Sequence, residues 1–129
     1  MSLFGRGRGG PARVTARKAA ARTDSARAAG NSGASVLLDV READEWQAGH
    51  APGAVHLPLT ALAAGARLPA AAQARPVVVI CRSGRRSRRA VELLRARGVE
   101  AVDVIGGMQE WAGAGLPVVD AQGGNGTVA

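Results

Sequence analysis

The chain has 129 residues, a formal net charge of +7 and a single cysteine, and these features exclude several classes of protein. One cysteine cannot form a disulfide within the chain, and with only two histidines it cannot build a structural zinc site. No apolar run approaches the ~20 residues that a membrane-spanning helix requires, and the first residues lack the apolar core of a secretory signal. These features predict a cytoplasmic protein that uses neither a metal nor a membrane.

The positive charge is concentrated at the beginning of the chain. Residues 1–30 contain seven basic residues and one acid, whereas residues 31–129 contain ten arginines and nine acids. Only three aromatic residues are present (Phe4, Trp46 and Trp111), so no platform for stacking nucleic-acid bases is expected. A nucleic-acid binder is therefore disfavoured, and the basic first 30 residues would better suit docking to an acidic partner surface.

The first half of the chain predicts short helices and strands. Residues 1–12, rich in glycine and arginine, are expected to form a flexible leader. An alanine-rich helix is expected next, with Thr15 as its N-cap and Gly30 as its stop. The apolar run at 36–40 predicts a buried strand. Further expected elements are a helical turn at 41–50, a short strand at 54–57, a weak helix at 59–68 and a linker at 69–76.

The second half begins with the strongest strand prediction, "VVVIC" at 77–81, which is apolar on both faces as in a central parallel strand. An amphipathic helix is expected at 87–98, with Val91, Leu93 and Leu94 facing inward and Gly98 ending it. Further expected elements are a strand at 101–105, a short helix at 108–115, an exit segment at 116–119 and a disordered tail at 120–129.

This alternation of strands and helices predicts an α/β fold. We expect a central, mostly parallel sheet of about five short strands with helices on both faces. A single domain at 13–119 would then lie between the leader and the tail.

The only cysteine lies where such a fold binds its ligands. Cys81 ends the strongest strand, and parallel sheets bind ligands outside the carboxyl ends of their strands. The N–H groups of the following loop can curl around an anion, with Gly84 supplying the backbone freedom. Positive surroundings favour the thiolate, which is the nucleophilic form of cysteine. We therefore assign Cys81 as the catalytic residue, with a substrate-binding loop of Arg82, Ser83, Gly84, Arg85, Arg86 and Ser87.

An alternative interpretation treats Cys81 as a small buried packing residue, because a free cysteine often ends an apolar strand in that role. The loop argues against it, since glycine, serines and arginines pack poorly but bind anions well. The arginines of the following helix are expected only to solvate its outer face; they are Arg88, Arg89, Arg95 and Arg97.

Three segments together resemble a single-domain rhodanese, which is a sulfurtransferase: "LLDVREADEWQAGHAPGAVHLPL", "VVVICRSGRRSRRAVELL" and "VDVIGGMQEWAGAGLPVV". The resemblance covers roughly residues 12–119. Ala51 replaces a larger aliphatic residue of the family pattern and His56 replaces an asparagine, but neither belongs to the cysteine loop.

The resemblance implies a reaction without a cofactor. Cys81 would attack the outer sulfur of thiosulfate or another sulfur donor, form a persulfide and release sulfite. The persulfide would then pass to cyanide in an assay, or to a small thiol or a protein in the cell. No histidine base is required, because the loop N–H groups and arginines stabilise the thiolate.

Three other functions stay open: a phosphatase, a sulfur-relay module, and a non-catalytic rhodanese-like domain, although such domains typically lose the cysteine that this chain retains. Related phosphatases and arsenate reductases place five residues between the cysteine and an arginine, whereas "CRSGRR" places four between Cys81 and Arg86, which favours sulfur transfer. The second is a sulfur-relay or protein-interaction module that delivers its persulfide only to a dedicated partner.

The remaining motif residues are expected to support the structure. Asp39 and Arg41 would form a buried polar pair that fixes the loop region, and His50 would be a hydrogen-bonded turn residue. The other members of this group would form a turn and two core anchors; they are Gly106, Gly107, Trp46 and Trp111.

Overall fold

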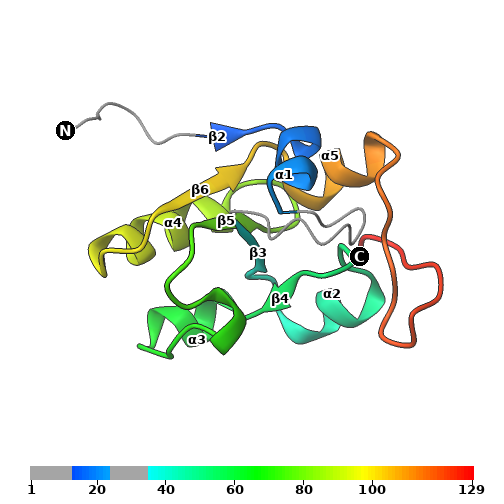
Figure 1. The fold of residues 1–129 in the computed structure, drawn as a ribbon. Coiled ribbons are helices and arrows are strands. Elements are labelled where there is room, and N and C mark those ends of the chain that lie inside the picture. Colours follow the sequence, from blue (N-terminus) through cyan, green and yellow to red (C-terminus); the bar gives the residue numbers. More distant parts are fainter. Residues whose placement is uncertain (1–12, 24–34) are drawn as a thin grey trace.

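A computed structural model describes residues 13–23 and 35–129 of the chain (Figure 1). All five strands in these residues are parallel, in the order β2-β6-β5-β3-β4. The strands are β2 (Arg13–Val14), β3 (Val36–Asp39), β4 (Val55–His56), β5 (Val77–Ile80) and β6 (Ala101–Val104). The central strands β3 and β5 are buried along their whole length, as their apolar sequences predict.

Helices cover both faces of the sheet, which confirms the predicted α/β fold. The helices are α1 (Ala16–Thr23), α2 (Ala43–Ala48), α3 (Leu59–Ala63), the short 3-10 helix η1 (Ala70–Ala72), α4 (Arg86–Ala96) and α5 (Gly107–Gly113). One core cluster joins β5 to α3 and α4 through Leu62, Val91 and Leu94. A second joins the sheet to α1 and α5, which lie side by side in Figure 1. None of the helices in the described part of the chain combines the length and the hydrophobicity that a membrane-spanning helix requires.

The edge strand β2 is a feature that the sequence did not predict. Arg13 and Val14 pair in parallel with Asp103 and Val104 of β6, and two residues are too few to show a strand periodicity. Thr15 caps the helix that follows, because its Oγ1 accepts a hydrogen bond from Lys18 N at 3.2 Å. The expected leader at 1–12 and the expected helix end at Gly30 lie outside the described residues.

The last ten residues, for which the sequence predicts disorder, are placed as a loop that returns along α2 (red in Figure 1). Thr127 N donates to Ala48 O at 2.9 Å, and Val128 packs against the second core cluster. Gly126 lies so close to the Gly49 backbone that a Cβ on it would be only 2.8 Å from Gly49 Cα. Such backbone-to-backbone packing leaves no hydrophobic pattern in the sequence.

Candidate active site

The structure places Cys81 directly after β5, at the carboxyl edge of the sheet. Its side chain is buried, with 1% of the residue exposed, and Gly84 N donates a hydrogen bond to Sγ at 3.1 Å. Gly84 has φ of +98°, and a Cβ on it would come within 3.0 Å of Gly106 N. A glycine is therefore needed at this position for the loop to curl around the sulfur.

Ser87 forms the second contact to the sulfur. It lies in the first turn of α4, and its Oγ is 3.4 Å from Cys81 Sγ. The same hydroxyl donates a hydrogen bond to Asp103 Oδ2 at 3.1 Å, and both residues are buried. The sulfur thus lies beside the positive N-terminal end of α4, where negative charge is stabilised.

Arg13, in the first strand of the described residues, contacts the carboxylate of Asp103 and so extends the series Cys81–Ser87–Asp103. Its Nε donates to Asp103 Oδ1 and its Nη2 to Asp103 Oδ2, both at 3.0 Å, and Nη2 also reaches Gly84 O at 3.3 Å. The hydrogen bonds to Asp103, aided by attraction to an ionised Cys81, raise the pKa of Arg13 above its usual value. Neither Arg13 nor Asp103 was singled out from the sequence, because only the parallel pairing of β2 with β6 brings them together.

Arg86, expected to bind substrate, is already paired with a carboxylate. Its Nη1 and Nη2 donate to Glu45 Oε1 and Oε2 of α2 at 2.7 and 2.8 Å. These hydrogen bonds, together with one from Glu42 N, lower the pKa of Glu45 to about 2. The charge of Arg86 is therefore largely compensated before any substrate arrives.

The loop cations that have no side-chain carboxylate partner among the described residues lie on its outer rim. Arg82, Ser83 and Arg85 are exposed, and Arg82 Nε donates to the main-chain oxygen of Ala129 at 2.7 Å. Arg88 is also exposed, on the first turns of α4. An anionic group that approaches Cys81 would meet these side chains first.

The three residues expected to support the structure lie beside the loop-forming end of β3. Arg41 Nη2 contacts Asp39 Oδ2 at 2.7 Å, and both side chains are fully buried. The same Nη2 donates to Gly49 O at 2.6 Å, so the pair ties β3 to the end of α2. His50 Nδ1 lies 2.7 Å from Trp46 O.

The two tryptophans differ from each other in their surroundings. Trp111 is fully buried and donates from Nε1 to Pro117 O at 2.8 Å, as expected for a core anchor. Trp46 is only half-buried, so the prediction that it anchors the core is wrong. Its ring instead stacks on the imidazoles of His50 and His56, with centroids 3.6 and 4.8 Å apart.

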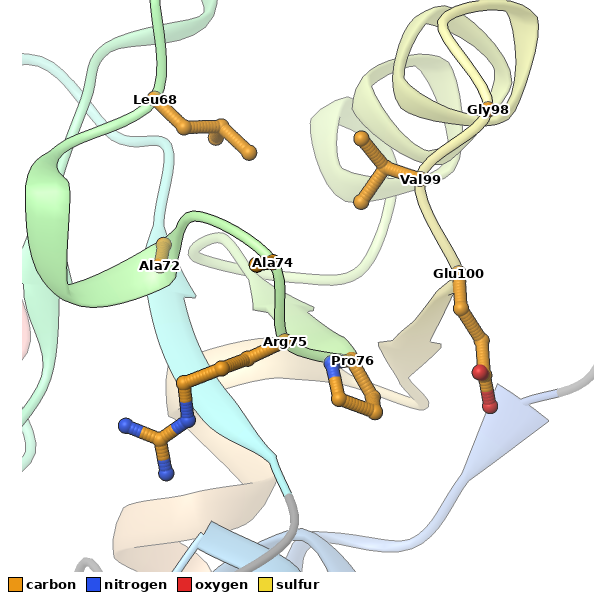
Figure 2. A pocket seen from close by; sticks show the side chains of 8 residues that line it. All are labelled: Leu68, Ala72, Ala74, Arg75, Pro76, Gly98, Val99 and Glu100. Carbon is orange, nitrogen blue, oxygen red and sulfur yellow. The ribbon is translucent and has the colours of Figure 1, made fainter.

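A pocket of about 330 Å³ lies at the other edge of the sheet. Figure 2 shows Leu68 and Val99 on its opposite walls and Arg75 and Glu100 at its rim. Pro76 and Glu100 immediately precede β5 and β6, so the pocket lies at the amino ends of the strands, away from the Cys81 loop. Parallel sheets bind ligands at the carboxyl ends, which makes the Cys81 loop the better candidate site. In residues 13–23 and 35–129, no three metal-binding side chains come together.

Comparison with known proteins finds relatives whose names refer to sulfur chemistry. A Bacillus subtilis protein named as a sulfur carrier protein is 37% identical over 78 residues, or 60% of this chain and 41% of that protein. An adenylyltransferase and sulfurtransferase of Zea mays is 42% identical over 82 residues, or 59% of this chain and 18% of that protein. The chain thus spans less than half the length of these relatives.

Solved structures with the same fold include a rhodanese-related protein of Thermoplasma volcanium. It is 35% identical, with a TM-score of 0.59 over 74% of this chain and 93% of that one. A rhodanese-like domain protein of Staphylococcus aureus is 27% identical, with a TM-score of 0.62 over 77% of this chain and 89% of that one. The sequence model of the rhodanese-like domain matches residues 22–114. The chain therefore belongs to the rhodanese-like domain family.

Proposed function

We propose that this protein is a sulfurtransferase that carries sulfane sulfur as a persulfide on Cys81. The Cys81 thiolate attacks the outer sulfur of thiosulfate, a new S–S bond forms, and the S–S bond of thiosulfate breaks. Sulfite leaves with the bonding electron pair, and the negative charge moves to the outer sulfur of the persulfide. A thiophilic acceptor such as cyanide then takes that sulfur and restores the thiolate.

One observation carries this proposal: the only thiol of the chain accepts a hydrogen bond from a loop N–H at the N-terminal end of a helix. Gly84 N donates to Sγ at 3.1 Å, and Ser87 in the first turn of α4 contacts the same atom. The loop N–H bonded to Sγ and the N-terminal end of α4 both stabilise a thiolate before the attack. Membership of the rhodanese-like family supports sulfur transfer as the general reaction.

The exposed rim suits an anionic donor. Arg82 and Arg85 would meet the sulfonate end of thiosulfate, while the attacking sulfur lies deeper, at the base of the loop. Four residues separate Cys81 from Arg86, a spacing that suits a single sulfur atom better than a tetrahedral phosphate. A reducing, cytoplasmic location would keep Cys81 as a free thiol between cycles.

The test compares wild type with Cys81→Ser in a thiosulfate:cyanide sulfurtransferase assay. We expect turnover in the wild type and none in the variant. Mass spectrometry after thiosulfate treatment should show one added sulfur, ~32 Da, on the wild type only. Absence of both turnover and added sulfur would contradict the proposal, and hydrolysis of an aryl phosphate by the wild type would favour a phosphatase instead.

A sulfur relay to a dedicated partner is the second candidate function. Cys81 is almost completely buried, while the exposed cations around it form a surface that an acidic partner could contact. The relatives named as a sulfur carrier and as a sulfurtransferase are consistent with such a transfer. With labelled sulfur on Cys81, transfer to a protein acceptor but not to glutathione or cyanide would favour the relay; ready transfer to small thiols would count against it.

A further inference from the structure

We propose that Arg13 and Asp103 act through the Ser87 hydroxyl to set the pH at which Cys81 becomes a thiolate. Both are positioning residues, since neither contacts the sulfur. The inference rests on the proposed function only in taking Cys81 as the reacting group, and its test needs no sulfur donor.

The argument begins with the single hydrogen of the Ser87 hydroxyl. Ser87 Oγ lies 3.1 Å from Asp103 Oδ2 and 3.4 Å from Cys81 Sγ. A carboxylate accepts a hydrogen bond more strongly than a neutral thiol does, so the hydroxyl donates to Asp103. Its oxygen then faces the sulfur, and the contact is best satisfied when the thiol S–H donates to Ser87. In this arrangement Asp103 favours the protonated thiol.

Ionisation of Cys81 reverses that preference. A thiolate cannot donate, so the Ser87 hydroxyl must turn its hydrogen from Asp103 to the sulfur to stabilise the new charge. Two anions, Asp103 and the thiolate, then compete for one hydroxyl hydrogen in a buried site.

Arg13 makes it easier for the Ser87 hydroxyl to rotate its hydrogen from Asp103 to the sulfur. Its Nε and Nη2 donate to both oxygens of Asp103 at 3.0 Å, so the carboxylate keeps two strong hydrogen bonds after losing the one from Ser87. The attraction between Arg13 and an ionised Cys81, which contributes to the raised pKa of Arg13, acts in the same direction. Arg13 therefore favours the thiolate, and Asp103 opposes it.

Other charged groups surround the loop and stay constant in the test. Among the described residues these are Arg86 on α4 with its partner Glu45 on α2, the exposed Arg82 and Arg85 of the loop itself, the exposed Arg88 on α4, and Glu110 on α5 beside Gly106. Because the variants leave these groups in place, opposite effects of Arg13 and Asp103 would report on the pair itself.

The experiment measures the rate of iodoacetamide alkylation of Cys81 as a function of pH. The single cysteine makes the signal specific, and alkylation reports the thiolate fraction directly. We expect Asp103→Asn to move the midpoint of the profile to lower pH and Arg13→Gln to move it to higher pH. Each shift should be roughly one pH unit, the size that a nearby charge typically produces.

Ser87→Ala tests the hydroxyl as the connecting group. In a Ser87→Ala background, Asp103→Asn should move the midpoint less than it does in the wild type, because the hydrogen bond through which it acts is gone. An equal shift in both backgrounds would overturn the role of Ser87.

The exposed ion pair of Arg89 with Glu92 on α4 supplies matched controls. Arg89→Gln and Glu92→Gln should leave the midpoint unchanged, since this pair is solvent-screened. A shift to higher pH in Asp103→Asn, or no shift in both Arg13→Gln and Asp103→Asn, overturns the proposal. If Asp103→Asn does not fold, Arg13→Gln decides alone: a midpoint at or below that of the wild type overturns it. A failure of sulfur transfer with these shifts present would refute only the proposed function.

Discussion

Arg86 of the cysteine loop and Glu45 of α2 form a bidentate ion pair, with N–O distances of 2.7 and 2.8 Å. The pair fastens the loop to the segment after β3. It also belongs to a pattern, because Arg13 is held by Asp103 and Arg41 by Asp39. These three arginines are thus neutralised by carboxylates, whereas the exposed Arg82, Arg85 and Arg88 have no side-chain carboxylate partner in residues 13–23 and 35–129.

Glu45→Gln should make the protein a better catalyst with thiosulfate. Removal of the carboxylate frees Arg86 to attract the donor, so kcat/KM for thiosulfate should rise by roughly three- to tenfold, the equivalent of about 1 kcal/mol. Gln can still accept the hydrogen bond from Glu42 N that closes the capping box of α2. Steady-state kinetics over a range of thiosulfate concentrations, at low and high salt, would measure the effect.

Asp44→Asn is the control for this prediction. Asp44 is exposed and precedes Glu45 on the same helix, so its loss changes the net charge equally without releasing Arg86. Equal rate increases in the two variants would mean that long-range attraction, and not the release of Arg86, explains the effect.

The same ion pair should make stability depend on acid pH. The pKa of Glu45 is lowered from 4.5 to about 2 by Arg86, so the folded state prefers the ionised carboxylate. Its contribution is present above pH 4.5 and is lost as the pH falls toward 2. We expect Glu45→Gln to unfold more easily than wild type by about 1–2 kcal/mol at neutral pH, an estimate reduced for the partial exposure of the pair.

Urea unfolding of both proteins at a series of pH values would check this. The difference in unfolding free energy should shrink steadily below pH 4.5, the ordinary pKa of the carboxyl. A difference that stays constant across this range would show that Glu45 acts through packing and not through its charge.

The sequence predicts the local parts of the site but not the contacts between residues that are far apart along the chain. Cys81 and its loop could be proposed as the site because the signal is local: an apolar strand followed by a glycine- and arginine-rich turn. The Arg13–Asp103 contact joins residues 90 positions apart, and Arg86–Glu45 joins residues 41 apart. The sequence displays these charges but not their pairing, which depends on strand order and helix placement.

The fold shows the same division. Strands β3 and β5 were predicted because each is an uninterrupted apolar run between turn residues. The edge strand β2 has only two residues, and its extended conformation depends on pairing with β6. No local sequence pattern therefore predicts it. Trp46 was expected in the core with the other motif residues, but it is half-buried and its ring packs on two histidines.

Asp39→Asn should strongly destabilise the fold. The Arg41 side chain is fully buried and its Nε and Nη2 donate to Asp39, so the variant would leave a buried charge without a counter-charge. Breaking such a pair typically costs about 3–5 kcal/mol. Chemical denaturation would measure the loss, with Glu92→Gln on the exposed face of α4 as a control expected to change stability by less than ~0.5 kcal/mol. A loss of that small size in Asp39→Asn would show that the pair does not support the loop region.

Gly107→Ala should damage both stability and the Cys81 loop, whereas Gly113→Ala in the same helix should not. Gly107 has φ of +57°, and a Cβ on it would collide with Cys81 O and with the backbone of Arg82. That contact lies where Met108 N donates to Cys81 O at 2.7 Å, so relief of the collision must move the cysteine backbone. We expect a loss of about 2 kcal/mol or more from strain and collision, together with slower sulfur transfer. Gly113→Ala is the matched control in the same helix. A Cβ on Gly113 would meet nothing within 4 Å and the φ of Gly113 is not positive, so alanine there should stabilise α5 by roughly 0.5 kcal/mol.

Thermal melts and alkylation rates of both variants would test this prediction. A Gly107→Ala protein that is as stable and as reactive as wild type would contradict the close approach of α5 to the loop.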